Sequence, residues 1–308
     1  MFLYYINYRP DESDLCNLEM RVIFNKDLSE KYFLSEKDFD IDRSVFIKYK
    51  IDILASSNSF DELIKKVEKL NINQEKYKVK YFDVDDKVKV EFNEKHRLEG
   101  IIGERIEGDV DVYNPKVMFA LTLVDGTWIF GRYIKNSGEW HKHEHKPVYY
   151  CNALPVRIAR SMLNIGLGDN LNKKVVDPCC GVGTVLLEAA ALSVDIEGYD
   201  INDKVVENAV KNIEFFGYDV KVENKDIANV DKKYDLAIID LPYGILSITS
   251  DEEIMHILKS AARITKEAVI AAVSDIRKEL DEAGFKVVDY AVVPKKHFKR
   301  FIFKCILK

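Results

Sequence analysis

The sequence Val175-Val176-Asp177-Pro178-Cys179-Cys180-Gly181-Val182-Gly183-Thr184 decides the fold of the second half of the chain. Val175 and Val176 are β-branched and suit a buried strand. Gly181 and Gly183 tolerate positive φ angles and let another molecule approach the backbone closely. Good helix-forming sequence follows over residues 185–192, so the first amide groups of that helix would point at the glycine turn. The stretch therefore predicts a strand, a ligand-binding turn and a helix.

The spacing of the two glycines leaves two interpretations open. A dinucleotide fingerprint has a third glycine, which is missing here, and Pro178 follows the leading Asp177. A strand, a turn with two glycines and a helix also occur as an ordinary connection in α/β proteins. The rest of the chain has to decide between a ligand site and a plain connection.

Length and composition indicate a two-domain globular protein. The chain has 308 residues, a formal net charge of -6 and five cysteines without a CxxC pair. We expect reduced thiols and a cytoplasmic location, because no signal peptide or membrane-spanning apolar run is visible and no membrane association is indicated. The negative charge argues mildly against nucleic-acid binding, which depends on Lys and Arg neutralising phosphates.

Residues 1–140 alternate between strand and helix patterns and predict an α+β domain. A β-hairpin is indicated around Asp125-Gly126. The other predicted elements are a strand over 2–8, a helix near 15–23, a strand over 44–49, a helix beginning at Ser59 and strands within 76–92.

A change in amino-acid composition over residues 135–147 predicts the boundary between the two domains. Asn136-Ser137-Gly138 is typical of a linker, and His141, His143 and His145 alternate after it. No cysteine or carboxylate lies at a zinc-ligand spacing from these histidines, so we expect a solvated linker without a metal.

Residues 141–308 predict a doubly wound, mostly parallel α/β sheet. Strand and helix patterns alternate to the end of the chain. The last two strands are close enough to pair as an antiparallel hairpin. The predicted strands cover 174–176, 195–199, 220–223, 236–239, 268–273, 286–292 and 300–307, and the predicted helices cover 152–165, 185–192, 204–215, 252–264 and 274–283.

Four features follow predicted strands at the edge where open α/β sheets bind ligands. The first is the glycine turn, and the second is Asp200, whose carboxylate could accept hydrogen bonds from a ribose diol. The third, Asp226, could meet an exocyclic amine such as that of adenine, or could simply cap a turn. The fourth is Asp240-Leu241-Pro242-Tyr243-Gly244. Their joint occurrence favours a ligand site over a plain connection.

The fourth feature has the chemistry to hold a planar amine. The nitrogen of such an amine is a poor nucleophile because its lone pair is conjugated with the ring. Asp240 and the backbone carbonyl of Leu241 could both accept its hydrogens and aim the lone pair at an electrophile. Pro242 stiffens the turn, and Tyr243 offers a face on which an unstacked base can lie.

Asp-Pro-Cys-Cys-Gly-Val-Gly-Thr and Asp-Leu-Pro-Tyr-Gly resemble the S-adenosylmethionine-binding and catalytic motifs of class I N-methyltransferases. Residues 145–308, with Asn152-Ala153-Leu154-Pro155, look like the RNA methylase family that contains the tRNA guanosine-N2 methyltransferases. Residues 109–131 are similar to the end of a THUMP domain. The resemblance implies a Rossmann-like class I methyltransferase domain over 141–308, preceded over 1–140 by a ferredoxin-like and THUMP-like RNA-binding region.

The resemblance also implies a cofactor, a substrate and site residues. The cofactor would be S-adenosylmethionine, and the substrate would be the N2 atom of guanosine in tRNA. Leu241 replaces the first of two prolines in the family's catalytic motif, which affects the expected base preference. The base would be held by Asp240, Leu241, Pro242 and Tyr243, and the cofactor by Asp177, Pro178, Cys179, Gly181, Gly183, Thr184, Asp200, Ile201, Asp226, Ile227 and Asp240.

Several alternatives stay open at this point. The same chemistry would serve ribosomal RNA, DNA adenine or a protein glutamine, and a degenerate cofactor pocket would leave an RNA-binding protein. An NAD oxidoreductase would need the third glycine. The turn over Lys295–Arg300 is either an RNA-facing basic patch or a solvated hairpin tip.

Overall fold

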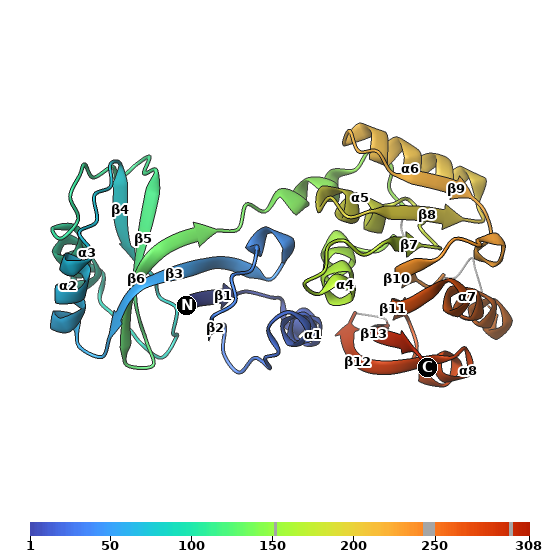
Figure 1. The fold of residues 1–308 in the computed structure, drawn as a ribbon, viewed down its shortest axis with the longest axis horizontal. Helices are drawn as coiled ribbons and strands as arrows, with labels where there is room; N and C mark the ends of the chain where they lie inside the picture. Colours follow the sequence, from blue (N-terminus) through green and yellow to red (C-terminus); the bar gives the residue numbers. More distant parts are fainter. Residues whose placement is uncertain (151–152, 243–249, 296–297) are drawn as a thin grey trace. The chain divides into compact units, whose positions relative to one another are not determined.

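The computed structural model describes residues 1–150, 153–242, 250–295 and 298–308 (Figure 1). The chain divides into two compact units. The first unit contains Met1–Asn7, Leu28–Asp42 and Phe46–Ser137, and the second contains Tyr8–Asp27, Arg43–Val45 and Gly138–Lys308.

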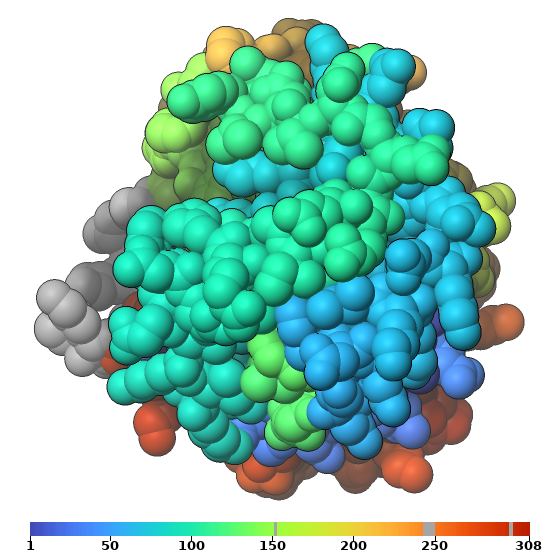
Figure 2. Space-filling model, turned by 90° about the vertical axis from the view of Figure 1, so that its left-hand side faces the viewer, coloured from blue at the N-terminus to red at the C-terminus, as the bar shows by residue number. Residues whose placement is uncertain are grey.

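The first unit is built on a six-stranded sheet with the order β2-β1-β3-β6-β5-β4. Neighbouring strands are antiparallel except for the parallel pair of β4 and β5. Apolar side chains of two helices pack against this sheet, and the helical side of the unit faces the viewer in Figure 2. The elements are β1 (Phe2–Ile6), β2 (Tyr32–Ser35), β3 (Ile47–Ser57), α2 (Phe60–Lys69), β4 (Tyr77–Tyr81), α3 (Phe92–Gly103), β5 (Val117–Val124) and β6 (Thr127–Lys135).

The prediction of strands throughout residues 76–92 is wrong after Tyr81. The side chain of Asp85 accepts a hydrogen bond from the amide of Lys87, and its carbonyl accepts one from the amide of Val88. These bonds turn the chain and end the alternation. Helix α3 then begins at Phe92, where the sequence indicated the end of a strand.

The second unit contains a seven-stranded sheet with the order β12-β13-β11-β10-β7-β8-β9. The five strands from β7 to β11 run parallel, and β13 is antiparallel to both β11 and β12. This arrangement confirms the predicted Rossmann-like sheet with a C-terminal antiparallel hairpin. The strands are β7 (Val175–Asp177), β8 (Ile196–Asp200), β9 (Lys221–Asn224), β10 (Tyr234–Asp240), β11 (Thr265–Ala272), β12 (Phe285–Pro294) and β13 (Lys299–Leu307).

Helices cover both faces of this second sheet. Leu258 of α7 and Leu280 of α8 belong to the same apolar cluster as Ile239 and Ile270 of the sheet. Helix α4 contacts β10, β11 and β13 and also packs against α1 and α5. The helices are α1 (Ser13–Phe24), α4 (Val156–Leu167), α5 (Thr184–Ala191), α6 (Asp203–Phe215), α7 (Asp251–Ile264) and α8 (Arg277–Glu282).

Helix α1 packs in the second unit although it comes from the first part of the chain. Arg21 makes two hydrogen bonds of 2.8 Å to the carboxylate of Asp289 on β12. Just before the helix, Glu12 accepts two hydrogen bonds, of 2.8 and 2.6 Å, from Arg157 of α4. A division at residue 140 assigns α1 to the N-terminal domain, whereas its side chains complete the core of the second unit.

The expectation of a solvated linker near residue 140 is wrong for its central residues. Residues Glu139–His145 form a 3-10 helix, η3, in which Trp140 and His143 are buried. His143 lies 2.6 Å from Glu188 of α5 and 3.1 Å from the hydroxyl of Tyr218. The sequence pattern missed this burial because both partners of His143 lie far along the chain.

Candidate functional site

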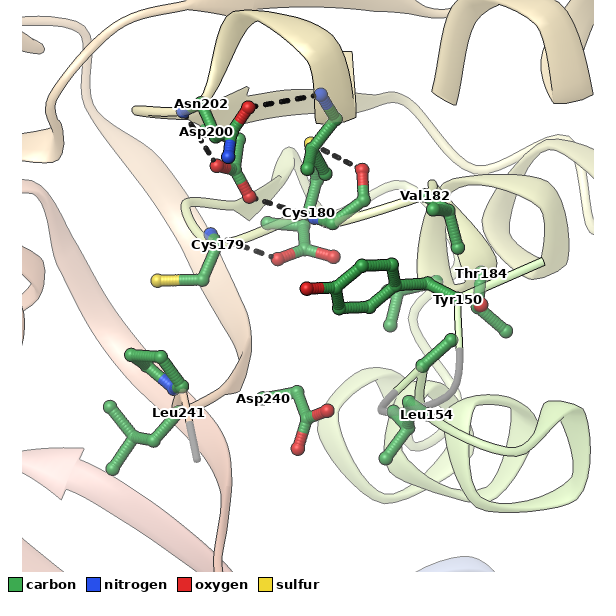
Figure 3. Close-up of a pocket in the computed structure, with 16 residues that line it drawn as sticks. Tyr150, Leu154, Cys179, Cys180, Val182, Thr184, Asp200, Asn202, Asp240 and Leu241 are labelled. Atoms are coloured by element: carbon green, nitrogen blue, oxygen red, sulfur yellow. Dashed lines mark hydrogen bonds between the residues drawn. The ribbon is translucent and has the colours of Figure 1, made fainter. Parts of the chain in front are cut away.

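A pocket of about 230 Å³ lies in the second unit, at the carboxyl ends of β7, β8 and β10 (Figure 3). This is the edge where ligands bind in open α/β sheets. The lining residues come from the glycine turn, from two strand ends and from the segment that leads into α4. They are Tyr150, Ala153, Leu154, Asp177, Cys179, Cys180, Gly181, Val182, Thr184, Val185, Asp200, Asn202, Val205, Asp240, Leu241 and Pro242.

The two glycines of the turn are required for different reasons. Gly181 has a φ of 53°, and a Cβ atom there would meet nothing within 4 Å, so the backbone borders open space. Gly183 has a φ of 82°, and a Cβ atom there would lie 3.3 Å from the Cβ of Ala209 on α6. Gly181 thus lets a ligand approach the backbone, and Gly183 lets α5 and α6 pack closely.

Asp200 ties the glycine turn to the end of β8. Its Oδ2 accepts a hydrogen bond of 3.0 Å from the amide of Gly181, and its Oδ1 accepts one of 2.9 Å from the amide of Asn202. Asn202 in turn caps α6 by accepting hydrogen bonds from two amides of its first turn. Each carboxylate oxygen can accept a further hydrogen bond, so Asp200 remains able to bind hydroxyl groups of a ligand.

Two carboxyl groups line the pocket: Asp177 is buried, and Asp240 is half-buried with its Oδ1 atom fully covered. Burial raises the pKa of Asp240 to about 7, although the positive charge of Arg300 opposes the rise. Burial, together with the charges of Asp240 and Asp200, also raises the pKa of Asp177. The Asp177 side chain accepts a hydrogen bond of 3.2 Å from the amide of Cys179.

Two buried oxygen atoms that belong to lining residues have no hydrogen-bond partner among the described residues. They are Oδ1 of Asp240 and Oγ1 of Thr184. Leaving a buried acceptor without a partner costs about 1–3 kcal/mol, which a bound molecule can recover by donating a hydrogen. The pocket therefore offers hydrogen-bonding capacity that the described protein does not use.

The adjacent cysteines of the turn are neutral thiols rather than nucleophiles. Burial raises the pKa of both Cys179 and Cys180, and the charges of Asp177 and Asp200 add to the effect. Because the thiolate is the reactive form, covalent catalysis by these cysteines is disfavoured.

The pocket brings together many of the residues that the sequence assigned to cofactor and base. Asp177, Cys179, Gly181, Thr184, Asp200, Asp240, Leu241 and Pro242 line it. Pro178, Gly183, Ile201, Asp226 and Ile227 are not among its lining residues. Tyr243 lies outside the described residues.

Asp226 has two partners outside the pocket. Its side chain accepts a hydrogen bond of 2.7 Å from the amide of Ala228 and so caps η4 (Ile227–Asn229). Its two oxygens also lie 3.0 and 3.2 Å from Nε2 of His256 on α7. Its assignment to the adenine ring of a cofactor stays a prediction.

Tyr150 is a lining residue that the sequence did not single out. Its ring projects into the pocket between the Cys179–Cys180 part of the turn and Asp240 (Figure 3). The available signal was its position just before the Asn152-Ala153-Leu154-Pro155 motif. The other lining residues that sequence reasoning did not assign to the site are Ala153, Leu154, Cys180, Val182, Val185, Asn202 and Val205.

Buried polar contacts hold the segment that carries Tyr150. The fully buried Asn212 of α6 accepts a hydrogen bond from the amide of Val148 and donates to its carbonyl, at 2.9 and 3.1 Å. The same amide nitrogen donates to the carbonyl of Val182 in the glycine turn at 2.9 Å. One side chain therefore links the turn to the backbone two residues before Tyr150.

One residue of the basic turn predicted over Lys295–Arg300 is buried rather than exposed. Arg300 is only 2% exposed and does not belong to a surface patch. Lys295 lies 3.6 Å from Asp11. Lys296 and His297 lie outside the described residues.

Two classes of feature are absent from the part of the chain that the structure describes. Over residues 1–150, 153–242, 250–295 and 298–308, no three His, Cys, Asp or Glu side chains are grouped so that they could hold a metal ion. Within the same residues, none of the helices has the length and apolar character needed to span a bilayer.

Residues 145–283 match the family described as RMKL-like, methyltransferase domain. The chain is 30% identical over 167 residues to a tRNA (guanine(10)-N2)-dimethyltransferase of Methanothermobacter thermautotrophicus, covering 51% of this chain and 49% of that protein. It is 28% identical over 214 residues to the protein of that name in Pyrococcus abyssi, covering 64% of each. The chain thus spans about half to two thirds of the length of these curated relatives.

The fold is similar to that of one solved structure over the whole length of both chains. The crystal structure of TrmN from Thermus thermophilus matches with a TM-score of 0.50 and 14% identity, covering 100% of this chain and 99% of that chain. At this identity the similarity concerns the fold alone.

Proposed function

We propose that the protein is an S-adenosylmethionine-dependent RNA N-methyltransferase that acts on N2 of guanosine in tRNA, because residues 145–283 match the family described as RMKL-like, methyltransferase domain. The observation that carries the proposal is Asp240, whose buried Oδ1 has no hydrogen-bond partner among the described residues and which shares a pocket with Gly181 and Asp200. The substrate is taken from the names of the two archaeal relatives.

The residues of the pocket fit S-adenosylmethionine, which when bound supplies a methyl group on a positively charged sulfur atom. Gly181 presents bare backbone to it, and Asp200 can accept hydrogen bonds from its ribose hydroxyls. The carboxyl groups of Asp177 and Asp240 line a pocket that is otherwise partly apolar, and their negative charge would offset the positive charge on the sulfur atom of the cofactor.

Asp240 would prepare the amine of the target base. Its Oδ1 accepts one amine hydrogen, which draws electron density onto the nitrogen and fixes the direction of its lone pair. When the new nitrogen–carbon bond forms, the amine has to lose one proton. A carboxylate whose pKa is about 7 can take that proton near neutral pH.

We expect Tyr150 to contribute an aromatic face beside Asp240. A base taken out of its stack needs a flat partner, and stacking on an aromatic side chain contributes about 1–3 kcal/mol. Tyr150→Ala should lower kcat/KM for tRNA about tenfold or more, whereas Tyr150→Phe should keep most activity because the ring remains. Steady-state methyl transfer with each variant checks this.

A control and a contradicting outcome accompany the Tyr150 prediction. Tyr149→Ala is the matched control, since Tyr149 is also exposed but is not among the lining residues of the pocket. Equal loss of activity in Tyr150→Phe and Tyr150→Ala would show that the hydroxyl, rather than the ring, matters.

The first unit would bind the RNA as a THUMP-like module. Side chains suited to unpaired nucleotides are exposed on it: Tyr113 is 92% exposed and Phe92 is 70% exposed. Lysines 65, 66 and 69 of α2 are exposed as well, so the negative net charge of the chain does not prevent a local attraction for phosphates.

The function is tested by offering different acceptors to the full chain. Labelled S-adenosylmethionine is incubated with tRNA, a ribosomal RNA fragment, adenine-containing DNA and a glutamine peptide in parallel. We expect label on tRNA and N2-methylated guanosine in its nucleoside digest. Label on another polymer would show that this polymer, rather than tRNA, is the substrate. Absence of cofactor binding in calorimetry would favour an RNA-binding protein with a degenerate pocket.

A further inference from the structure

Arg300 is a buried cation in the part of the sheet that leads to the pocket. It begins β13 after Lys299, is 2% exposed and is among the largest fully buried side chains of the described residues. Burying a charge is costly unless an opposite charge compensates it. The positive charge of Arg300 therefore requires a nearby anion to compensate it.

Strand register places Arg300 on the same face of the sheet as Asp240. Asp240 pairs with Ala271 of β11, and Ala271 pairs with Ile302 of β13, so these three side chains share a face. Arg300 is two residues from Ile302 and points to that same face. β13 runs antiparallel to β11, so going back from Ile302 to Arg300 moves toward the carboxyl edge where Asp240 lies.

The side chain between the two strands is small. Ala271 contributes only a methyl group to this face, so the long guanidinium side chain of Arg300 can extend over it toward β10. We propose that Arg300 is a positioning residue that keeps the Asp240 carboxylate ionised, so that Asp240 can accept hydrogens from the target amine near neutral pH. The effect of Arg300 on the ionisation of Asp240 does not depend on the proposed function. Its effect on the rate of methyl transfer does rest on the proposed function.

The charges around Asp240 make this role necessary. Asp177 on β7 and Asp200 on β8 line the same pocket, and the charges of Asp240 and Asp200 both raise the pKa of Asp177, so the carboxyl groups disfavour one another's ionised forms. Cys179 in the glycine turn is a neutral thiol and offers no compensating positive charge. Burial favours the neutral acid as well. Arg300 is the positive charge that lowers the pKa of Asp240 against these effects.

The test is the pH dependence of methyl transfer in Arg300→Met and Arg300→Lys. Loss of the guanidinium should move the acid limb of the rate–pH profile up by about one pH unit in Arg300→Met, and by less in Arg300→Lys, which keeps a charge. At pH 7 this shift lowers the rate about fivefold, whereas at pH 9 the rates of wild type and Arg300→Met converge.

A second measurement keeps the inference independent of activity. The carboxyl carbon of Asp240 is followed by NMR during a pH titration of the full chain labelled at aspartate, with Asp240→Asn used to assign the signal. We expect its midpoint to rise in Arg300→Lys, a variant that conserves size and charge and should fold. If the enzyme proves inactive on every acceptor, this titration still tests the electrostatic effect of Arg300 on Asp240.

Lys304→Met is the matched control, because Lys304 lies on the same strand and face of β13 but four residues from Arg300. Lys304→Met should change neither the acid limb of the rate–pH profile nor the midpoint of the Asp240 titration. An unchanged Asp240 midpoint in the Arg300 variants would overturn the inference. So would a rate loss in Arg300→Met that is the same at pH 7 and at pH 9.

Discussion

Asp240→Asn is expected to lower kcat/KM for methyl transfer about 10²- to 10⁴-fold while leaving a folded protein that still binds S-adenosylmethionine. The amide keeps the size of the side chain, but it carries no negative charge and cannot take a proton from the amine. Single-turnover transfer to tRNA, together with calorimetric titration of the cofactor, separates chemistry from binding.

The same variant should be more stable than the wild type at alkaline pH. The pKa of Asp240 rises from an ordinary value near 3.8 to about 7 on folding. Its favourable contribution is therefore fully present below about pH 4 and is lost as pH rises through 7. At pH 8 the wild type holds a desolvated charge that Asp240→Asn removes. The rise of the pKa from 3.8 to about 7 corresponds to a gain of about 4 kcal/mol in the free energy of unfolding.

Thermal melts at pH 5 and pH 8 check the sign of this effect. The stability gain should be clearly smaller at pH 5 than at pH 8, and it should vanish only below about pH 4, where the carboxyl group is protonated in both the folded and the unfolded chain. Asp231→Asn is the control, since the Asp231 side chain is 96% exposed and far less coupled to folding. Wild-type rates for Asp240→Asn would end its assignment as the catalytic residue, whatever the melts show.

A polypeptide of residues 138–308 alone is expected not to fold cooperatively, although it contains every strand of the seven-stranded sheet. It lacks α1, whose Leu15, Leu18 and Met20 are fully buried in the second unit. Its absence uncovers apolar surface and leaves Arg157 of α4 without Glu12. The combined loss exceeds about 5 kcal/mol, which is comparable to the whole stability of a typical domain.

A further buried contact is lost in that fragment. Asn164 of α4 donates hydrogen bonds of 2.8 Å to the carbonyl of Arg43 and 3.3 Å to Glu19, and both partners would be missing. Urea denaturation followed by circular dichroism measures the effect. Residues 8–45 joined through a flexible linker to 138–308 should restore a cooperative transition. A fragment 138–308 that melts like the full chain would contradict the prediction.

Local sequence signals were sufficient for the sheet of the second unit and for much of the pocket. The strands of this sheet contain β-branched or apolar residues, and the connections after β7, β9 and β11 contain glycine or an acidic residue. Gly181, Asp200 and Asp240 follow strands that run parallel, so their order along the chain already places them at one edge. Sequence alone therefore determined the fold class and the core of the candidate site.

Contacts between distant residues were decided only by the tertiary structure. Nothing in the pattern of α1 says which sheet its apolar face covers, because amphipathic periodicity specifies a buried face but not a partner. His143 looks like a solvated residue until Glu188 and Tyr218 are placed beside it. Helix α3 was missed because the turn at Asp85 ends an alternation that the sequence appeared to continue.

The surroundings of Asp240 were likewise determined partly by local sequence and partly by the tertiary structure. The sequence determined that a carboxylate ends one strand and that a glycine turn follows another, since both are local features, and the pairing of β10 with β7 then sets them side by side. Only the tertiary structure brought Tyr150 into the pocket and Arg300 onto the same face of the sheet. A pKa depends on burial and on charges from every neighbouring element, and those are set by packing and register rather than by the order of residues along the chain.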